Sequence, residues 1–276
     1  MVIFPNAKIN IGLNIIEKRS DGFHELETVF YPVPVKDALE IIISKNESDQ
    51  DINFTSSGNE INVNAENNLC VKAFYLIKKD FPQIPSVKMH LHKHIPTGAG
   101  MGGGSADASS VLLLLNNYFN LNISQNKLLH YALLVGSDCP FFIINKPSFA
   151  AGRGEKLLPI NIDLSGYKIL IVHPGIHVNT AEAFKELNQN NFSSTGELQE
   201  NILTDIKQWK TSIKNDFEFS VFKKYPAIAA IKNKLYEEGA IYSSMSGSGS
   251  AVFGIFVKEA SPELIKFPSH YFCQVV

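Results

Sequence analysis

The sequence predicts an α+β protein of two domains. A chain of 276 residues, 45% of them apolar, can bury a large core, and chains of this length more often form two domains than one. Patterns typical of strands and of helices occur in both halves, which favours an α+β arrangement. Between residues 155 and 166 the patterning is interrupted by Pro159, Asn161 and Gly166. We therefore expect domains over 1–158 and 159–276.

The first strand is predicted by "INIGLNII" at 9–16, where apolar and polar residues alternate as in a half-buried strand. Because alternate side chains share a face, Lys8 and Asn10 should project together from its polar side. The patterns that follow in the first half predict strands at 39–43, around 52–55, at 61–63 and at 86–94. They also predict helices from Asn68 to about Lys79, at 105–119, and at 125–135 with Ser124 and Gly136 as caps.

The second half begins with a strand predicted at 168–174, "KILIVHP". Helical patterns follow near 180–190, 197–210 and 218–238. Strand patterns follow near 241–245, 251–257 and 270–276. The polar run "NQNNFSST" at 188–195 is expected to be a loop.

Charge and cysteine content limit the classes of function. The formal net charge of −2 gives no general attraction for nucleic acid or anionic lipid, so we expect neither a nucleic acid nor a membrane as partner. The three cysteines are far apart and form no CxxC motif, which suits a reducing compartment. No basic and apolar targeting pattern and no apolar run of about 18 residues is visible, so a cytoplasmic protein is predicted.

A glycine-rich segment, "IPTGAGMGGGSADASS" at 95–110, joins a predicted strand to a predicted helix. Taken alone, such a segment is more often a flexible linker. The first turn of a helix, however, presents unpaired N–H groups and the positive end of the helix dipole, and glycines let a phosphate approach them. The segment has neither the acidic partner of the Rossmann motif nor the Gly-Lys-Ser/Thr of Walker A. A third type of phosphate-binding loop is therefore predicted.

Three motifs, in this order, resemble those of the galactokinase, homoserine kinase, mevalonate kinase and phosphomevalonate kinase (GHMP) superfamily. They are "AKINIGLNI" at 7–15, "PTGAGMGGGSADA" at 96–108 and "MSGSGSAVFGIF" at 245–256. The resemblance implies an N-terminal domain like domain 2 of ribosomal protein S5 and a ferredoxin-like C-terminal domain. It also implies a small-molecule kinase with ATP and Mg²⁺ as cofactors.

Three further motifs are similar to one branch of that superfamily, and the likeness covers nearly the whole chain. They are "RSDGFHELETVF" at 19–30, "VGSDCPFF" at 135–142 and "PGIHVNTAEAF" at 174–184. This branch phosphorylates the tertiary 2-hydroxyl of diphosphocytidyl-methylerythritol in the non-mevalonate isoprenoid pathway. In such a transfer the protein contributes mainly alignment and charge stabilisation.

The resemblance implies two catalytic residues, Lys8 and Asp138. Asp138 would accept the hydroxyl proton, and Lys8 would stabilise the charged groups. Each residue alone has a structural alternative: Asp138 a turn or helix cap before Pro140, and Lys8 a solvated strand lysine.

The resemblance implies that ATP is held by the glycine-rich loop, with its β- and γ-phosphates on backbone N–H groups. The residues concerned are Pro96, Gly98, Gly100, Gly102, Gly103, Gly104 and Ser105. Asn68 and Lys93 are implied for the adenine, although Asn68 could equally be a helix N-cap and Lys93 an edge-strand lysine.

No protein metal site is predicted. Mg²⁺ should arrive with ATP, since no Asp, Glu and His cluster indicates a dedicated cage. His90, His92 and His94 share one strand face and could ligate a metal, but Lys88 on the same face favours an exposed polar surface.

The acceptor is implied to contact Asn10, Gly247 and Gly249, and its cytosine to contact Phe23, Phe184 and His24. A selective cytosine pocket needs flat groups on the ring faces and hydrogen bonds at the edge. The alternatives are a hairpin turn for the two glycines and core packing for the two phenylalanines.

Several positions depart from the family pattern without removing a proposed catalytic group. Phe23 replaces the more usual tyrosine, Ala106 a common serine, and Met101 a leucine, while Ser250 and Ala251 replace a common Pro-Thr pair.

Two other functions remain open. "DGFHE" and Phe184 argue against another GHMP kinase of the homoserine or mevalonate type, and the presence of Lys8 and Asp138 argues against a non-catalytic ligand sensor. The near-neutral charge disfavours a nucleic-acid-binding protein.

Overall fold

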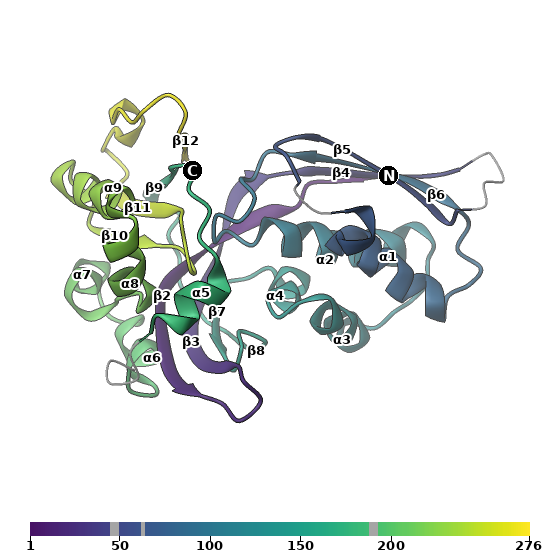
Figure 1. Ribbon diagram of the computed structural model, residues 1–276, viewed down its shortest axis with the longest axis horizontal. Coiled ribbons are helices and arrows are strands. Elements are labelled where there is room, and N and C mark those ends of the chain that lie inside the picture. Colours follow the sequence, from purple (N-terminus) through teal and green to yellow (C-terminus); the bar gives the residue numbers. More distant parts are fainter. Residues whose placement is uncertain (45–49, 62–63, 188–192) are drawn as a thin grey trace. The chain divides into compact units, whose positions relative to one another are not determined.

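The computed structural model describes residues 1–44, 50–61, 64–187 and 193–276, and it is an α+β protein (Figure 1). The chain forms two compact units. Unit 1 comprises Met1–Ala7, Pro34–Thr97 and Gly102–Asn145, and unit 2 comprises Lys8–Val33, Gly98–Met101 and Lys146–Val276. These units are built from separate chain segments, whereas the predicted domains are continuous. The boundary after residue 158 therefore stays a prediction.

Unit 1 contains a four-stranded sheet in the order β1-β4-β6-β5. The pair β5 and β6 is parallel, and the other neighbours are antiparallel. The strands are β1 (Val2–Ile3), β4 (Ala38–Ile43), β5 (Ile52–Gly58) and β6 (Val87–Lys93). The strands predicted at 39–43, 52–55 and 86–94 are thus confirmed. Of the strand predicted at 61–63, Ile61 lies in no strand and 62–63 fall outside the described residues.

Helices lie on one side of this sheet, and some of them pack on other helices rather than on the strands (Figure 1). They are α1 (Leu69–Asp80), α2 (Gly103–Tyr118), α3 (Gln125–Val135), α4 (Cys139–Ile144) and the short 3-10 helix η1 (Ala65–Asn67). The helices expected at 68–79, 105–119 and 125–135 are confirmed, as is the cap by Ser124, whose hydroxyl accepts from Lys127 N at 3.4 Å. Alternate residues of β6 face the helices, so that Val87, Met89 and Leu91 join the core.

Unit 2 holds most of a second sheet, in the order β2-β3-β7-β8. Its strands are β2 (Asn6–Lys18), β3 (His24–Lys36), β7 (Ser148–Ala151) and β8 (Lys156–Pro159). The strand predicted at 9–16 is present, but the expectation that it is half-buried is wrong. Every residue from Ala7 to Ile15 is buried, because both faces of β2 are covered. Polar side chains on this strand therefore need partners within the protein.

A third sheet, also in unit 2, has the order β10-β11-β9-β12 and is antiparallel throughout. Its strands confirm the predicted ones: β9 (Tyr167–His173), β10 (Tyr242–Met245), β11 (Val252–Val257) and β12 (Phe272–Val275). Apolar residues of the sheet and of the helices beside it form one core that includes Val172, Phe217 and Ile231.

The helices of unit 2 are shorter than the sequence pattern suggested. They are α5 (Thr180–Lys185), α6 (Glu197–Asn201), η3 (Ile206–Gln208), α7 (Trp209–Ser212), α8 (Phe217–Lys224), α9 (Pro226–Glu237) and η4 (Pro262–Leu264). The single helix predicted at 218–238 is wrong, because Pro226 cannot continue a helix and disfavours helical backbone at Tyr225. The helix predicted at 197–210 is also wrong, since the Asp205 side chain starts a new turn by accepting from Lys207 N at 2.9 Å. The helix predicted at 180–190 ends at Lys185, and 188–190 are outside the described residues.

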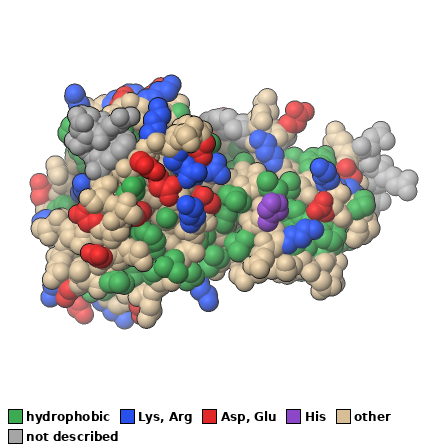
Figure 2. Space-filling model, turned by 90° about the horizontal axis from the view of Figure 1, so that it is seen from below, with side chains coloured by type: hydrophobic (Ala, Val, Ile, Leu, Met, Phe, Trp, Pro, Cys, Tyr) green, Lys and Arg blue, Asp and Glu red, His purple; other side chains and the backbone are tan. Residues whose placement is uncertain are grey.

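Charges of both signs are distributed over the surface. Figure 2 shows one face, on which Lys and Arg side chains are interspersed with Asp and Glu side chains. Within the described part of the chain, none of the helices has the length and apolar character needed to cross a membrane.

Candidate active site

Lys8 is a buried lysine of β2 in unit 2, with 3% of its surface exposed. Its ammonium donates to Asn10 Oδ1 at 2.5 Å and to the Gly100 carbonyl at 3.0 Å. It also lies 5.0 Å from the centre of the Phe30 ring. The alternative of a solvated strand lysine is therefore wrong, and the predicted pairing of Lys8 with Asn10 on one face is confirmed.

Asn10 connects this lysine to a loop that the sequence had assigned only through its glycines. Its backbone N–H donates to Ser246 Oγ at 3.1 Å, and Ser246 Oγ in turn donates to the Gly100 carbonyl at 2.9 Å. Its side-chain amide donates to Thr28 Oγ1 at 2.9 Å. Ser246 and Thr28 were not predicted as site residues. The only sequence signal for Ser246 was its place inside "MSGSGS".

Residues 246–251 and Gly98–Met101 are in close backbone contact within unit 2. Ala251 N donates to the Ala99 carbonyl at 3.0 Å. Gly100 has φ +78°, and a Cβ on it would lie 2.0 Å from the Ser246 carbonyl oxygen. Gly247 and Gly249 lie in the connection between the antiparallel strands β10 and β11, so the hairpin interpretation of these glycines is confirmed. A side chain at Gly100 cannot be accommodated without moving the backbone.

Asn215 holds this hairpin connection in place, although it lies about thirty positions earlier in the chain. Its buried side-chain amide donates to the carbonyls of Met245 and Gly247, each at 2.8 Å. Its own Oδ1 accepts from Phe217 N at 3.0 Å. Sequence reasoning missed Asn215, because nothing local distinguishes it from a surface asparagine.

The second part of the glycine-rich segment, Gly102–Ser105, belongs to unit 1 and begins helix α2. Gly102 is the N-cap residue with φ +69°, and the first turn of α2 contains no acidic residue. A Cβ on Gly103 would lie 2.9 Å from Ile95 Cγ2, whereas one on Gly104 would meet nothing closer than Leu69 Cδ1 at 3.8 Å. The N–H groups of this turn and the exposed face at Gly104 are suited to an anion.

Lys93 is buried, 4% exposed, in unit 1 and bonded to two buried carboxylates. Its ammonium makes an ion pair with Asp37 and another, at 2.8 Å, with Asp107. Asp37 Oδ1 also accepts from the backbone N–H groups of His94 and Ile95 at 2.6 and 2.8 Å. Since β6 lies between β4 and β5, the alternative of an edge-strand lysine is wrong.

In the group formed by Lys93, Asp37 and Asp107, burial and the oppositely charged neighbours shift the pKa values in opposite directions. Burial raises the pKa of Asp107 to about 7, assisted by the Asp37 carboxylate and opposed by Lys93. For Lys93 burial lowers the pKa, but the two carboxylates outweigh it and the pKa lies above its usual value. Asp107 Oδ1 is buried without a hydrogen-bond partner. The ammonium of Lys93 thus has a structural function, and an adenine contact by Lys93 stays a prediction.

Asn68 is the N-cap of α1, as one interpretation of the sequence expected. Its Oδ1 accepts from Cys70 N at 2.8 Å, and the side chain is 6% exposed. Asp138, in unit 1, occupies the N-cap position of α4 with helical backbone angles, and its side chain makes no capping hydrogen bond. The turn part of the structural alternative is therefore confirmed, since Ser137 and Asp138 form the turn before α4, and the capping part is wrong. A catalytic role stays a prediction.

Phe23, His24 and Phe184 all belong to unit 2 but have different surroundings. The His24 ring stacks on Phe184, with centroids 4.7 Å apart and planes 16° apart, and Phe184 meets Phe217 edge-on at 4.8 Å. Core packing is thus confirmed for Phe184. Phe23 is 51% exposed at the connection between β2 and β3, and its ring contacts the Arg153 guanidinium at 4.6 Å. Core packing is wrong for Phe23.

His90 and His92 lie on an exposed polar face of β6, as predicted, whereas His94, also exposed, follows the end of the strand. His90 makes hydrogen bonds with Thr55 Oγ1 at 2.8 Å and Ser57 Oγ at 2.9 Å, and His92 with Ser57 Oγ at 3.0 Å. No group of three or more His, Cys, Asp or Glu side chains suited to a metal ion occurs in the described ranges.

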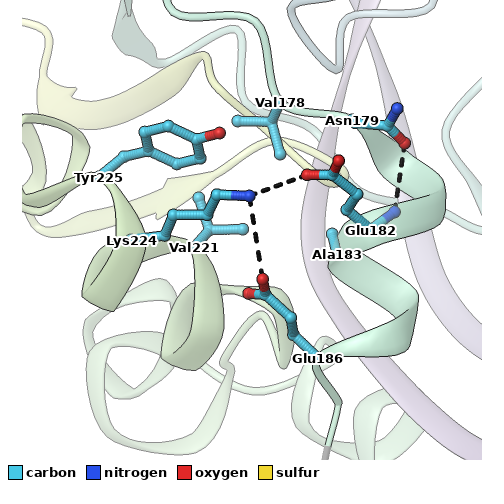
Figure 3. Close-up of a pocket in the computed structure, with 8 residues that line it drawn as sticks. All are labelled: Val178, Asn179, Glu182, Ala183, Glu186, Val221, Lys224 and Tyr225. Carbon is cyan, nitrogen blue, oxygen red and sulfur yellow. Dashed lines mark hydrogen bonds and ion pairs between the residues drawn. The ribbon is translucent and has the colours of Figure 1, made fainter.

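A small depression in unit 2 lies between α5 and α8 and contains none of the predicted site residues (Figure 3). Lys224 reaches across it to Glu182 at 2.8 Å and to Glu186 at 3.9 Å. Its cation is already matched by these carboxylates, so the depression adds nothing to the candidate site.

Comparison with known proteins identifies the family. Residues 68–146 match the GHMP kinases N terminal domain, and 181–267 match the GHMP kinases C terminal model. A 4-diphosphocytidyl-2-C-methyl-D-erythritol kinase of Bacteroides fragilis is 51% identical over 94% of this chain and 93% of its own. One of Bacteroides thetaiotaomicron is 48% identical over 99% of this chain and 98% of its own.

A solved structure agrees with this similarity. A crystal structure of 4-(cytidine 5'-diphospho)-2C-methyl-D-erythritol kinase superposes with a TM-score of 0.80 at 28% identity, over 94% of this chain and 91% of that one. The fold and the motifs together define a GHMP kinase, an ATP-dependent enzyme whose two-domain α+β fold confirms the predicted class. Within that class, the chain belongs to the family of 4-diphosphocytidyl-2-C-methyl-D-erythritol kinases.

Proposed function

We propose that this protein transfers the γ-phosphoryl group of ATP to the 2-hydroxyl of 4-diphosphocytidyl-2-C-methyl-D-erythritol, in the non-mevalonate isoprenoid pathway. The proposal rests on one observation: over nearly its full length, about half of the residues of this chain are identical to those of enzymes named for this substrate. A cytoplasmic location stays a prediction, and it rests on the cysteine content and on the sequence patterns described above.

The phosphates of ATP are proposed to bind the glycine-rich segment. In unit 1, Gly102, Gly103, Gly104 and Ser105 form the first turn of α2, where backbone N–H groups and the helix dipole favour anions. In unit 2, the segment Gly98–Met101 is held in place by Ser246 and Lys8, which supports a preformed loop. Pro96 leads into the segment, and Asn68 and Lys93 remain the candidates for the adenine.

Mg²⁺ is proposed to enter with ATP. The residues at the start of α2 fit such an ion, since the half-buried Ser105 carries a hydroxyl that can add one oxygen to those of phosphates and water, which Mg²⁺ prefers. When bound, the ion would neutralise charge on the phosphates.

For the chemical step, we propose that the Asp138 carboxylate accepts the proton of the 2-hydroxyl. The alcohol oxygen then forms a bond to the γ-phosphorus while the bond to the β,γ-bridging oxygen breaks and ADP leaves. Lys8 supplies a positive charge that is held in one orientation by Asn10 and Gly100. Its proposed role is to favour the charged form of the base and to neutralise the negative charge that develops on the acceptor oxygen.

The acceptor is proposed to bind unit 2 through Asn10, the loop with Gly247 and Gly249, and the aromatic residues Phe23, His24 and Phe184. The contact of His24 with Phe184 at 4.7 Å leaves no space for a third ring between them. We therefore expect the cytosine to stack on an outer face of this pair or on the exposed ring of Phe23.

An acceptor screen with ATP tests the proposed substrate. The purified protein is offered diphosphocytidyl-methylerythritol, homoserine, mevalonate and galactose, and ADP release is measured. Turnover with the first compound alone is expected. Turnover with homoserine or mevalonate instead would favour another GHMP kinase, and no turnover with any would favour a ligand sensor.

Asp138→Asn tests the chemical step. We expect a fall in kcat of about 10²–10⁴-fold, the usual contribution of a general base, with ATP binding nearly intact. Asp80→Asn, at an exposed position on the last turn of α1, serves as the matched control. Activity of Asp138→Asn within a few-fold of the unmodified protein would show that Asp138 is structural.

A further inference from the structure

We infer that Arg153 positions the Phe23 ring for the cytosine: its guanidinium covers one face of the ring and leaves the other face to the base. This inference rests on the proposed function, because it assigns a specificity-determining contact to the acceptor site. Arg153 acts through Phe23, and it is a positioning residue.

The contact between the two side chains is a stack of a cation on an aromatic ring. The Arg153 guanidinium carbon lies 4.6 Å from the centre of the Phe23 ring, while Phe23 remains 51% exposed. A guanidinium is planar and weakly hydrated, and it stacks on aromatic faces more readily than an ammonium does. About half of the Phe23 surface therefore remains exposed to solvent beside this contact.

A network of hydrogen bonds fixes both members of the stack. Arg19 bonds Glu25 at 2.6 Å and Asp21 at 2.9 Å, and Asp21 Oδ1 accepts from Phe23 N at 3.1 Å. These bonds shape the connection between β2 and β3, which lies beside β7 and β8 (Figure 1). The backbone of the tip is therefore ordered even though the Phe23 ring is exposed.

The same network holds the turn that carries Arg153. Glu25 Oε1 accepts from Gly152 N at 3.0 Å, and Leu26 N donates to the Gly152 carbonyl at 2.8 Å. Arg153 N itself donates to Glu155 Oε2 at 2.6 Å. Glu25 thus joins the tip with Phe23 to the turn with Arg153, so the stack is defined by the backbone of both segments.

The spacing decides on which side of Phe23 a base can lie. A ring inserted between Arg153 and Phe23 would need two stacking contacts of about 3.5 Å each, or about 7 Å in total. The observed 4.6 Å is too short for that. The order of the stack is therefore Arg153, Phe23, base. A phenylalanine has no hydroxyl to anchor its ring, and the guanidinium restricts the ring orientation instead.

Arg153→Ala and Arg153→Lys test this assignment through two measurements. One is the acceptor KM with kcat and the KM for ATP, and the other is the Kd for cytidine diphosphate by calorimetry without ATP. For Arg153→Ala we expect the acceptor KM and this Kd to rise about three- to tenfold, as for one partly exposed cation–π contact, with kcat and the KM for ATP unchanged. Arg153→Lys should restore part of the loss.

A matched control and a double variant identify the mechanism. Lys156→Ala removes a cation from strand β8 that contacts Glu25 at 3.6 Å and is 63% exposed, and it should change neither constant. In a Phe23→Ala background, Arg153→Ala should add no further loss, because the two residues act as one unit.

Three results would overturn the assignment. Unchanged or lower KM and Kd in Arg153→Ala would mean that the guanidinium contributes nothing or competes with the base. An equal loss in the Phe23→Ala background would mean that Arg153 binds the diphosphate directly. An equal loss in Lys156→Ala would indicate a general effect of charge. Failure of the proposed function is separate, because it is measured as missing turnover of the acceptor by the unmodified protein, whereas the results above compare variants in cytidine diphosphate binding without ATP.

Discussion

The β2–β3 connection and helix α5 each supply an aromatic residue to the proposed cytosine site, but they hold it in different ways. Phe23 stands at an exposed tip, with Arg153 on one face. Phe184 packs against the core of unit 2, between His24 and Phe217. The first ring is half exposed, whereas the second is partly buried. Under the proposed function, Phe23 would serve ligand stacking alone, and Phe184 would serve both the ligand site and folding. Two residues that are proposed for one ligand contact can therefore contribute differently to the stability of the fold.

The largest difference between the β2–β3 connection and helix α5 is expected when Phe23→Ala is measured for acceptor binding and for stability. Stacking of a base on an aromatic ring contributes roughly 1–3 kcal/mol, so the acceptor KM should rise about ten- to a hundredfold. Since the ring is half exposed, the melting temperature should stay nearly constant. Steady-state kinetics and thermal unfolding check both expectations. An unchanged acceptor KM would remove Phe23 from the site and break the comparison.

Phe184→Ala should affect both folding and binding. Loss of a partly buried phenylalanine removes contacts with two rings, which we expect to destabilise the fold by about 2 kcal/mol and to lower the melting temperature by several degrees. The acceptor KM should also rise. Phe184→Leu restores most of the buried volume without an aromatic face, so it should recover stability more than KM. Recovery of both by leucine would show that Phe184 acts through packing alone.

The smallest effect concerns the protonation of His24. Burial, and secondarily the charge of Lys18, lower the pKa of His24 from its ordinary value of 6.5. Phe184 is stacked on this imidazole, so Phe184→Ala should let water in and raise the pKa of His24 back toward 6.5, while Phe23→Ala should leave it where it is. Titration of the His24 ring protons by NMR measures this difference. Equal pKa values in all three proteins would show that Phe184 does not shield His24.

The lowered pKa of His24 also predicts how the stability of the fold depends on pH. A histidine whose pKa is lower in the folded state is charged more readily when unfolded, so its contribution is complete above about pH 6.5 and is lost as pH falls below that value. His173, buried on β9, should contribute more strongly in the same direction, because burial lowers its pKa to about 4. Thermal unfolding from pH 7.5 to 4.5 should show a decline that His173→Gln reduces and His24→Gln reduces less.

The sequence predicted most strands and helices where one residue pattern dominates. It failed for strand β3 and for the helix predicted at 218–238, and prolines are the reason in both cases. β3 was missed because Pro32 and Pro34 stand inside its run, and proline usually excludes a strand. The break before Pro226 carried a clear signal, the proline itself, that the long apolar pattern obscured.

The candidate site was predicted through motifs rather than through contacts. Lys8 and Asn10 could be placed on one face because strand periodicity is strictly two. The burial of that face could not be foreseen, since it depends on residues such as Ser246, more than two hundred positions away. Asp37, Asn215 and Arg153 carried no local signal, because their partners are distant in sequence and are met only after folding.

The group formed by Lys93, Asp37 and Asp107 also limits how the sequence can change. Replacing Lys93 alone would leave two carboxylates buried without a cation, and breaking such a pair costs about 3–5 kcal/mol. Replacing Asp37 alone would leave the N–H groups of His94 and Ile95 without their acceptor. A swap of all three for apolar residues of similar volume would avoid the unpaired charges. We therefore expect these positions to change together in related sequences, because replacing Lys93 or Asp37 alone would lower the stability of the fold more than replacing the whole group.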